Sequence, residues 1–267
     1  MSADLPAPDA TESQRLVGAD RVLAALVRLG DHPDGVGLDD LARELGSAKP
    51  TVHRALASLK RAGLAAQAPD GRYALGDGLL RLAFSFHDAR PETAGVRDRL
   101  ASLTREFGET AHYAVLDGRE VVYREKVVPT TGGIQLTSTI GGRNPAHATA
   151  LGKILLADTF DDDGVRAWAA EQSLTTRTPH TITDPGRLVE EVAAARERGW
   201  AAEDEESELG VCCLAVPYDD ARPIAHARAI SVSSVASRTP LRALTERVDT
   251  IVAASRPLND PLEAPCV

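Results

Sequence analysis

The chain has 267 residues, of which 43% are hydrophobic, and a formal net charge of −9. This length and apolar content are sufficient for two ordinary domains with a core each. The three cysteines lack CxxC spacing, which argues against a disulfide framework or a zinc knuckle, and no apolar run approaches the roughly 20 residues of a membrane helix. We therefore expect a cytoplasmic protein without a membrane span.

Residues 1–14 are acidic and rich in proline, so we expect a disordered lead-in and not a signal peptide. Apolar residues then recur at helical spacing from Leu16 to Leu29, and Gly30 stops the run. The stretch GLDDLARELG, residues 37–46, predicts a second, short helix with two aspartates in its first turn.

A third helix is expected in SAKPTVHRALASLKRAGL, residues 47–64, with Ser47 as a possible cap and Pro50 in the first turn. Its inward-facing residues are Val52, Leu56 and Leu59. The next stretch, LAAQAPDGRYAL, alternates across a Pro-Asp-Gly turn, which is typical of a small hairpin. Together these pieces predict a winged helix-turn-helix domain over residues 15–76.

The charge of this domain indicates DNA as its partner. Between Ser47 and Tyr73 five basic residues stand against one acidic residue, which leaves a net charge of +4 inside an acidic chain. A helix-turn-helix lays its second helix in the major groove with its N-terminal residues toward the bases. The residues expected to contact double-stranded DNA are Lys49, Thr51, His53 and Arg54 of that helix and Arg72 of the wing.

The alternative is a helical core with a solvated basic surface. We consider it weaker because a plain core helix needs neither the wing nor the local positive charge, and both are present here. Residues 77–91 follow as a linker helix, and Pro91 breaks it. Its apolar stripe packs either on a second subunit or on its own chain; the stripe consists of Leu79, Leu80, Leu82, Ala83 and Phe86.

Residues 92–256 alternate between strands and helices and predict an α+β domain, with residues 257–267 as a tail. The expected helices are residues 96–107, residues 144–158 opened by Pro145, residues 188–198 closed by Gly199, and residues 239–255. The expected strands are residues 109–116, 119–128, 133–142, 210–220 and 224–234. Asp161, Asp162 and Asp163 are interpreted as a solvated loop.

Strand alternation divides the stretch GVCCLAVP, residues 210–217, between two faces. Val211, Cys213 and Ala215 share one face, whereas Cys212 and its alternate neighbours share the other. Ser231 and Ser233 likewise point to one side of their strand. If the two strands belong to one sheet, a polar patch lies beside Cys213.

Five motifs in order make the chain resemble the IclR family of bacterial transcription regulators from about residue 16 to residue 255. They are KPTVHRALASLKRAGL, GRYALGDGLLRLA, PAHATALGKILLA, the run from TPHTITDPGRLVEEV to GVCCLAVPYDD, and ISVSS. The resemblance implies an N-terminal winged helix-turn-helix, a linker helix, and a C-terminal GAF-like domain that binds a small-molecule effector and shifts DNA affinity. It also implies self-assembly into a homodimer, as a dimer of dimers, and more often repression than activation.

The same resemblance implies an effector site at Ala150, Leu151, Glu203, Val211, Cys213, Ser231 and Ser233. Asn144 joins them as a departure, because family members often have an apolar residue there, and Glu203 stands where a shorter aspartate occurs. Free N–H groups at a helix start near Thr149 to Leu151 favour a carboxylate, and the extra amide favours a ureide-like ligand. We expect no other cofactor.

Enzyme motifs are absent from the sequence. No phosphate-binding P-loop, GxSxG elbow or HExxH pair occurs, and the seven histidines lack metal-ligand spacing, so we expect neither a catalytic nor a metal site. The prediction is a ligand-responsive regulator, most simply a repressor on a palindromic operator. Two alternatives stay open: a small-molecule-binding protein with weak non-specific DNA binding, and an enzyme that uses Cys213.

Overall fold

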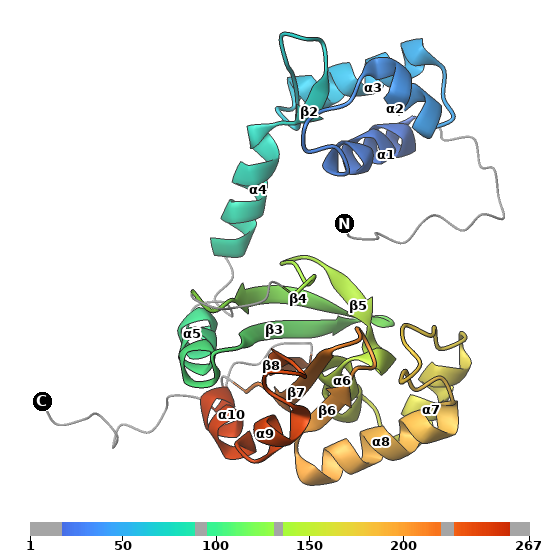
Figure 1. Cartoon of the computed structure of the whole chain (residues 1–267). Coiled ribbons are helices and arrows are strands. Elements are labelled where there is room, and N and C mark those ends of the chain that lie inside the picture. Colours follow the sequence, from blue (N-terminus) through green and yellow to red (C-terminus); the bar gives the residue numbers. More distant parts are fainter. Residues whose placement is uncertain (1–17, 89–94, 131–135, 220–226, 257–267) are drawn as a thin grey trace, which may run out of the picture. The chain divides into compact units, whose positions relative to one another are not determined.

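The computed structural model describes residues 18–88, 95–130, 136–219 and 227–256. The chain divides into two compact units, Met1–Pro91 and Glu92–Val267 (Figure 1). Within the described residues, no helix combines the length and the apolar character needed to cross a bilayer.

The N-terminal unit is a winged helix-turn-helix, as predicted. Its elements are α1 (Ala19–Gly30), α2 (Leu38–Glu44), α3 (Lys49–Arg61), β1 (Ala65–Gln67), β2 (Tyr73–Leu75) and α4 (Asp77–Asp88). The strands β1 and β2 pair antiparallel and form the wing. The apolar faces of the first three helices and of the wing meet in one core, whose fully buried members include Ala25, Leu29, Leu41, Val52 and Leu56.

Two details of this unit differ from the expectation. Ala48 is the N-cap of α3, and the Ser47 hydroxyl instead donates to the carbonyl of Leu45 at 3.0 Å. Ser47 therefore closes the turn after α2 and does not cap α3. Leu16 and Pro91, with which we bounded the first helix and the linker helix, lie outside the described residues.

The C-terminal unit is built on one six-stranded antiparallel sheet in the order β5-β4-β3-β8-β7-β6. The strands are β3 (Thr110–Asp117), β4 (Glu120–Val127), β5 (Arg143–Pro145), β6 (Ala201–Asp204), β7 (Val211–Pro217) and β8 (Arg228–Val235). The helices are α5 (Val96–Phe107), α6 (Ala150–Thr159), α7 (Asp162–Ala170), α8 (Pro185–Arg198), α9 (Leu241–Thr245) and α10 (Val248–Ser255), with a short 3-10 turn, η1 (Ala146–Ala148). Strands and helices form an α+β domain, as predicted.

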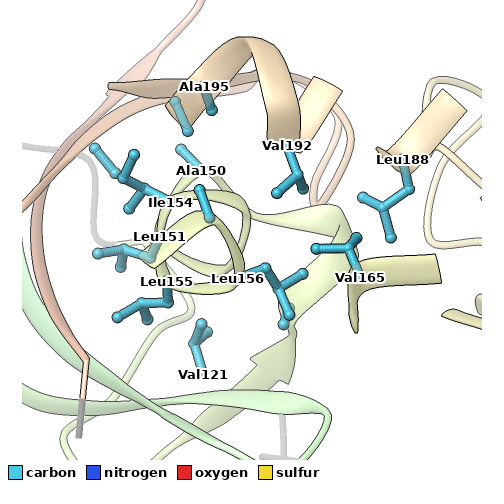
Figure 2. Close-up of a cluster of buried hydrophobic side chains, with 14 of the residues drawn as sticks. Val121, Ala150, Leu151, Ile154, Leu155, Leu156, Val165, Leu188, Val192 and Ala195 are labelled. Carbon is cyan, nitrogen blue, oxygen red and sulfur yellow. The ribbon is translucent and has the colours of Figure 1, made fainter. Parts of the chain in front are cut away.

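Helices cover both faces of this sheet. The helices α5, α9 and α10 pack on the face that carries Cys212, Leu214 and Val232. On the opposite face α6 is surrounded by apolar residues of the sheet, α7 and α8. Figure 2 shows Leu151 and Leu155 on α6, with Val121, Val165 and Val192 around the helix. The alternation expected for β7 is thus confirmed, because Cys212 belongs to one core and Cys213 packs against the other.

Several boundaries of the C-terminal unit were predicted wrongly. Residues 136–142 of the expected strand 133–142 are irregular, and two of their carbonyls bond to a side chain: the Lys126 ammonium donates to Leu136 O and Ser138 O. Residues 133–135 lie outside the described part. Pro145 ends β5 and does not open a helix; α6 begins at Ala150, where the Thr149 hydroxyl accepts from the amide of Gly152.

The expected solvated loop at residues 161–163 is the start of α7, because the Asp161 carboxylate caps it and Asp162 and Asp163 favour a helix N-terminus. The expected helix 239–255 is divided into α9 and α10. The short strand β6 was not anticipated.

Candidate functional site

The first turns of α3 carry the residues predicted to contact DNA. His53 and Arg54 are exposed, and Thr51 is half-buried. Lys49 is also exposed, but its ammonium lies 2.7 Å from the Asp39 carboxylate of α2. Lys49 must leave that surface ion pair to reach a phosphate or base, at a cost of less than about 1 kcal/mol.

The wing presents Arg72 at its tip. Its guanidinium donates to Gly35 O at 3.3 Å and lies 3.9 Å from the Asp70 carboxylate, while it stays exposed. The wing is held against α3 by the ammonium of Lys60, which donates to Gln67 at 2.8 Å. Arg72 is therefore oriented by the loop that precedes α2 and is accessible to a DNA backbone.

A second candidate site is a cavity in the C-terminal unit. About 450 Å³ of space, part of it open to solvent, lies between the sheet, the start of α6 and the segments 136–138 and 207–208. All eight residues predicted for effector binding line it, namely Asn144, Ala150, Leu151, Glu203, Val211, Cys213, Ser231 and Ser233. One cavity thus brings together residues from five separate elements or loops.

The register of the sheet places the polar side chains next to each other. Cys213 pairs with Glu203 of β6 on one side and with Ser233 of β8 on the other. Ser231 pairs in turn with His112 of β3. Since paired residues point to the same face, four strands deliver a continuous polar row to the cavity.

A chain of hydrogen bonds runs along this row. The Cys213 thiol donates to Ser233 Oγ at 3.0 Å, and Ser233 Oγ lies 3.3 Å from His112 Nδ1. His112 Nε2 in turn lies 2.8 Å from Ser138 Oγ. This order fits a neutral imidazole that accepts at Nδ1 and donates from Nε2.

Burial sets the protonation of these groups. Burial lowers the pKa of His112 to about 3, aided by the nearby Lys126 ammonium. Burial raises the pKa of Glu203 to about 7, against the opposing effects of the neighbouring Cys213 thiol and of the hydrogen bond from the Glu206 amide. Burial and the Glu203 charge raise the pKa of the Cys213 thiol well above its ordinary value. Cys213 is therefore a thiol at neutral pH, whereas a nucleophilic cysteine needs a thiolate.

Two groups of donors face the cavity without an assigned acceptor. Ala150 and Leu151 are the first residues of α6, and such N–H groups have no acceptor inside their helix. Ser231 Oγ is fully buried and has no hydrogen-bond partner among the described residues. A buried hydroxyl without a partner is unfavourable unless a ligand or water completes it.

Sequence reasoning missed other lining residues. They are His112, Tyr123, Leu136, Thr137, Ser138, Thr149, Ser207 and Glu208. Alternation would have placed His112 and Tyr123 on inward faces of the first hairpin, but only the tertiary pairing shows that they border a cavity. Asn144 donates to the Tyr123 hydroxyl at 3.1 Å, so this departure from the family pattern helps to fix the cavity wall. Over the described ranges, no group of three or more His, Cys, Asp or Glu residues could hold a metal ion.

The two units define the class of protein: a winged helix-turn-helix DNA-binding domain joined to an α/β domain is the organisation of a transcription regulator. The chain belongs to the IclR family, because the family model for the bacterial transcriptional regulator IclR C-terminal domain matches residues 93–259 and that for the IclR helix-turn-helix domain matches residues 18–69.

Named relatives agree with this assignment. The chain is 35% identical to the HTH-type transcriptional regulator XynR of Escherichia coli, over 82% of this chain and 86% of that protein. It is 32% identical to the transcriptional repressor IclR of the same organism, over 88% and 86% of the two chains. The crystal structure of Thermotoga maritima IclR covers 88% of this chain and 94% of its own, with 26% identity and a TM-score of 0.74.

Proposed function

We propose that this protein is a ligand-responsive transcriptional repressor of the cytoplasm that binds a palindromic operator and changes its DNA affinity when a small metabolite binds. DNA recognition is assigned to Lys49, Thr51, His53 and Arg54 in the major groove and to Arg72 on the flanking backbone. The effector site is the cavity around Cys213. The observation that carries the proposal is that the eight residues assigned to an effector site from the sequence all line that one cavity.

The chemistry of the cavity supports a carboxylate or ureide-like effector. Helix N–H groups and serine hydroxyls suit a carboxylate, and the amide of Asn144 adds a group that matches N–H and C=O functions. An IclR homologue from Microbacterium hydrocarbonoxydans was crystallised with 4-hydroxybenzoate; it is 23% identical, with a TM-score of 0.73, over 88% of this chain and 95% of its own. The two chains share the fold, and screening of carboxylates and ureides identifies the metabolite.

Exposed apolar residues support self-assembly, which a palindromic operator requires. Leu23 and Val27 lie one helical turn apart on α1 and are 59% and 47% exposed. On α4, Leu80 and Leu82 are more than half exposed. We propose a homodimer, assembled further as a dimer of dimers, and sedimentation velocity would measure the state directly.

The first test is a fluorescence-anisotropy titration of the full chain on the DNA upstream of its own gene, against a scrambled duplex at the same salt. We expect a preference of about 100-fold or more for the native duplex. Equal affinities for both duplexes with a steep salt dependence would instead identify a ligand-binding protein with non-specific DNA affinity.

Two variants separate the two sites. Arg54→Ala is expected to abolish operator preference and to leave effector affinity unchanged, and Ser233→Ala is expected to do the reverse. Arg166→Ala serves as the matched control, because it removes the same charge from an exposed site on α7. If both variants merely unfold the protein, the residue assignments fail.

A further inference from the structure

The cavity holds a buried acid without a basic side chain to balance a ligand's charge. Among the described residues that line it there is no lysine and no arginine. Glu203 is only 2% exposed, and its carboxylate accepts from the amides of Glu206 at 2.9 Å and Ser207 at 3.5 Å. Glu208 also lines the cavity but is exposed to solvent, so an entering anion meets a buried anion unless Glu203 carries a proton.

The same cavity nevertheless offers a seat for an anion. The N-terminus of α6 supplies the N–H groups of Ala150 and Leu151 and a positive helix dipole. Ser231 Oγ, buried and without a partner among the described residues, lines the same cavity and has both a donor and an acceptor to offer. The Tyr123 hydroxyl accepts from Asn144, so its own proton is available to a ligand.

We infer that the effector is a monocarboxylate that binds only while Glu203 is protonated, so that an ionised Glu203 takes up a proton on binding. The site rejects dicarboxylates, because no lining lysine or arginine among the described residues balances a second charge. This inference rests on the proposal that the cavity is the effector site. The incoming carboxylate binds the N–H groups of α6 and Ser231 Oγ. The proton comes from solvent, and the protonated Glu203 becomes a hydrogen-bond donor or a neutral neighbour of the ligand.

Several titratable or charged groups surround Glu203. They are Cys213 of β7, Tyr123 of β4, His112 of β3 through Ser233, Glu206 and Glu208 of the following loop, and Lys153 of α6. Burial keeps the Cys213 thiol and the Tyr123 phenol protonated, since it raises the pKa of both, and it keeps His112 neutral. The Lys153 ammonium is held by Glu206 at 2.5 Å and is not a lining residue, so it offers no charge to the ligand.

The affinity should therefore depend on pH in a defined way. Because the pKa of Glu203 lies at about 7 in the free protein, Glu203 is mostly protonated at pH 6 and mostly ionised at pH 8. If only the protonated form binds the anion, the apparent affinity falls about tenfold from pH 6 to pH 8, and binding at pH 7 takes up about half a proton.

Isothermal titration calorimetry of the full chain without DNA tests this. The probes are glycolate, lactate, benzoate and 4-hydroxybenzoate against oxalate, malonate, succinate and terephthalate, each up to about 10 mM. Titrations in two buffers of different ionisation enthalpy at each pH give the proton uptake. At least one monocarboxylate is expected to bind with the tenfold pH dependence, and the dicarboxylates are expected to bind at least tenfold more weakly.

Two variants sharpen the result. Glu203→Gln mimics the protonated acid and keeps an oxygen that accepts from the Glu206 amide, so its affinity should not vary with pH and its proton uptake should vanish. Glu190→Gln, which makes the same change at an exposed position of α8 outside the cavity lining, should retain both effects. If Glu203→Gln fails to fold, the wild-type proton uptake still decides the matter.

Three outcomes would overturn the inference: an affinity independent of pH, proton release on binding, or equal binding of dicarboxylates. No binding by any probe would also overturn it, because the site is assigned to the carboxylate group that all the probes share. Since DNA takes no part in these titrations, they can succeed when the operator titration fails. The opposite pairing, operator preference without carboxylate binding, would remove the inference and leave the regulator assignment standing.

Discussion

Replacing Glu203 with glutamine should make the C-terminal unit more stable, and increasingly so as the pH rises. Burial raises the pKa of Glu203 from 4.5 to about 7 in the folded chain. Between these two values the folded chain holds a proton that the unfolded chain has released. The free energy of unfolding that Glu203 contributes is therefore fully present below pH 4.5 and is lost as the pH rises to about 7.

The shift sets the size of the effect. A difference of about 2.5 pKa units corresponds to roughly 3 kcal/mol once both states have ionised. Glu203→Gln removes this penalty and keeps the acceptor for the Glu206 amide at 2.9 Å. We expect the variant to exceed the wild type by roughly 3 kcal/mol at pH 8 and by less than about 1 kcal/mol at pH 5.

Urea unfolding followed by tryptophan fluorescence measures this, because both tryptophans, Trp168 and Trp200, belong to the C-terminal unit. His112 titrates in the opposite direction: its pKa falls from 6.5 to about 3, so its contribution is lost as the pH drops below 6.5. That contribution is common to both proteins and cancels in their difference. A stability difference that is constant from pH 5 to pH 8, or a variant that is less stable at pH 8, would refute the reasoning.

Three further substitutions probe the packing around the cavity. Lys153→Met should lower the free energy of unfolding in urea by about 3–5 kcal/mol, because Glu206 would keep a buried charge without its partner at 2.5 Å. The double variant Lys153→Met/Glu206→Met should recover most of this loss. Equal stability of the wild type and both variants would contradict the prediction. Gly152→Ala should destabilise the C-terminal unit by more than about 3 kcal/mol, since the added Cβ would lie 2.0 Å from a carbonyl oxygen of η1. Gly30→Ala, which has open space around the added Cβ, should be tolerated. Similar melting temperatures for the two variants would contradict the prediction. Ser231→Ala should change the free energy of unfolding by less than about 1 kcal/mol, because the hydroxyl has no partner among the described residues. The same variant should bind the effector about tenfold more weakly in calorimetry. Unchanged binding would remove Ser231 from the site.

Much of the fold was predictable because local signals and packing agree. The α3 apolar face and the wing turn were evident in the sequence, and the strand period divided Cys212 from Cys213 correctly between the two cores. The prediction failed where a polar residue serves the backbone: Asp161 caps α7 and so converts an acidic stretch into a helix start. Composition alone does not distinguish such a cap from a solvated loop.

The cavity was predictable only in part. Strand alternation places Ser231, Ser233 and Cys213 on inward faces, but whether these residues are neighbours in space depends on the register between β7 and β8. An acidic run such as residues 203–208 is normally exposed, so only the family resemblance indicated that Glu203 contacts a ligand. In the structure, Glu203 pairs with Cys213 and therefore points inward. His112 was missed because its proximity to Ser231 depends on long-range pairing between β3 and β8.

The unfavourable features of the C-terminal unit are concentrated around this cavity. Glu203 is a buried acid, Ser231 Oγ has no partner among the described residues, and one carboxylate oxygen of Glu206 is likewise buried without one. Natural folds retain such local costs mainly where function requires them. A bound monocarboxylate would complete the hydrogen bonding of Ser231 and favour the protonated form of Glu203. Because the ligand would bind only the folded chain, a concentration about 100 times its dissociation constant should add about 2.7 kcal/mol to the free energy of unfolding. At the same ligand concentration, this added stability should be smaller at pH 8 than at pH 6.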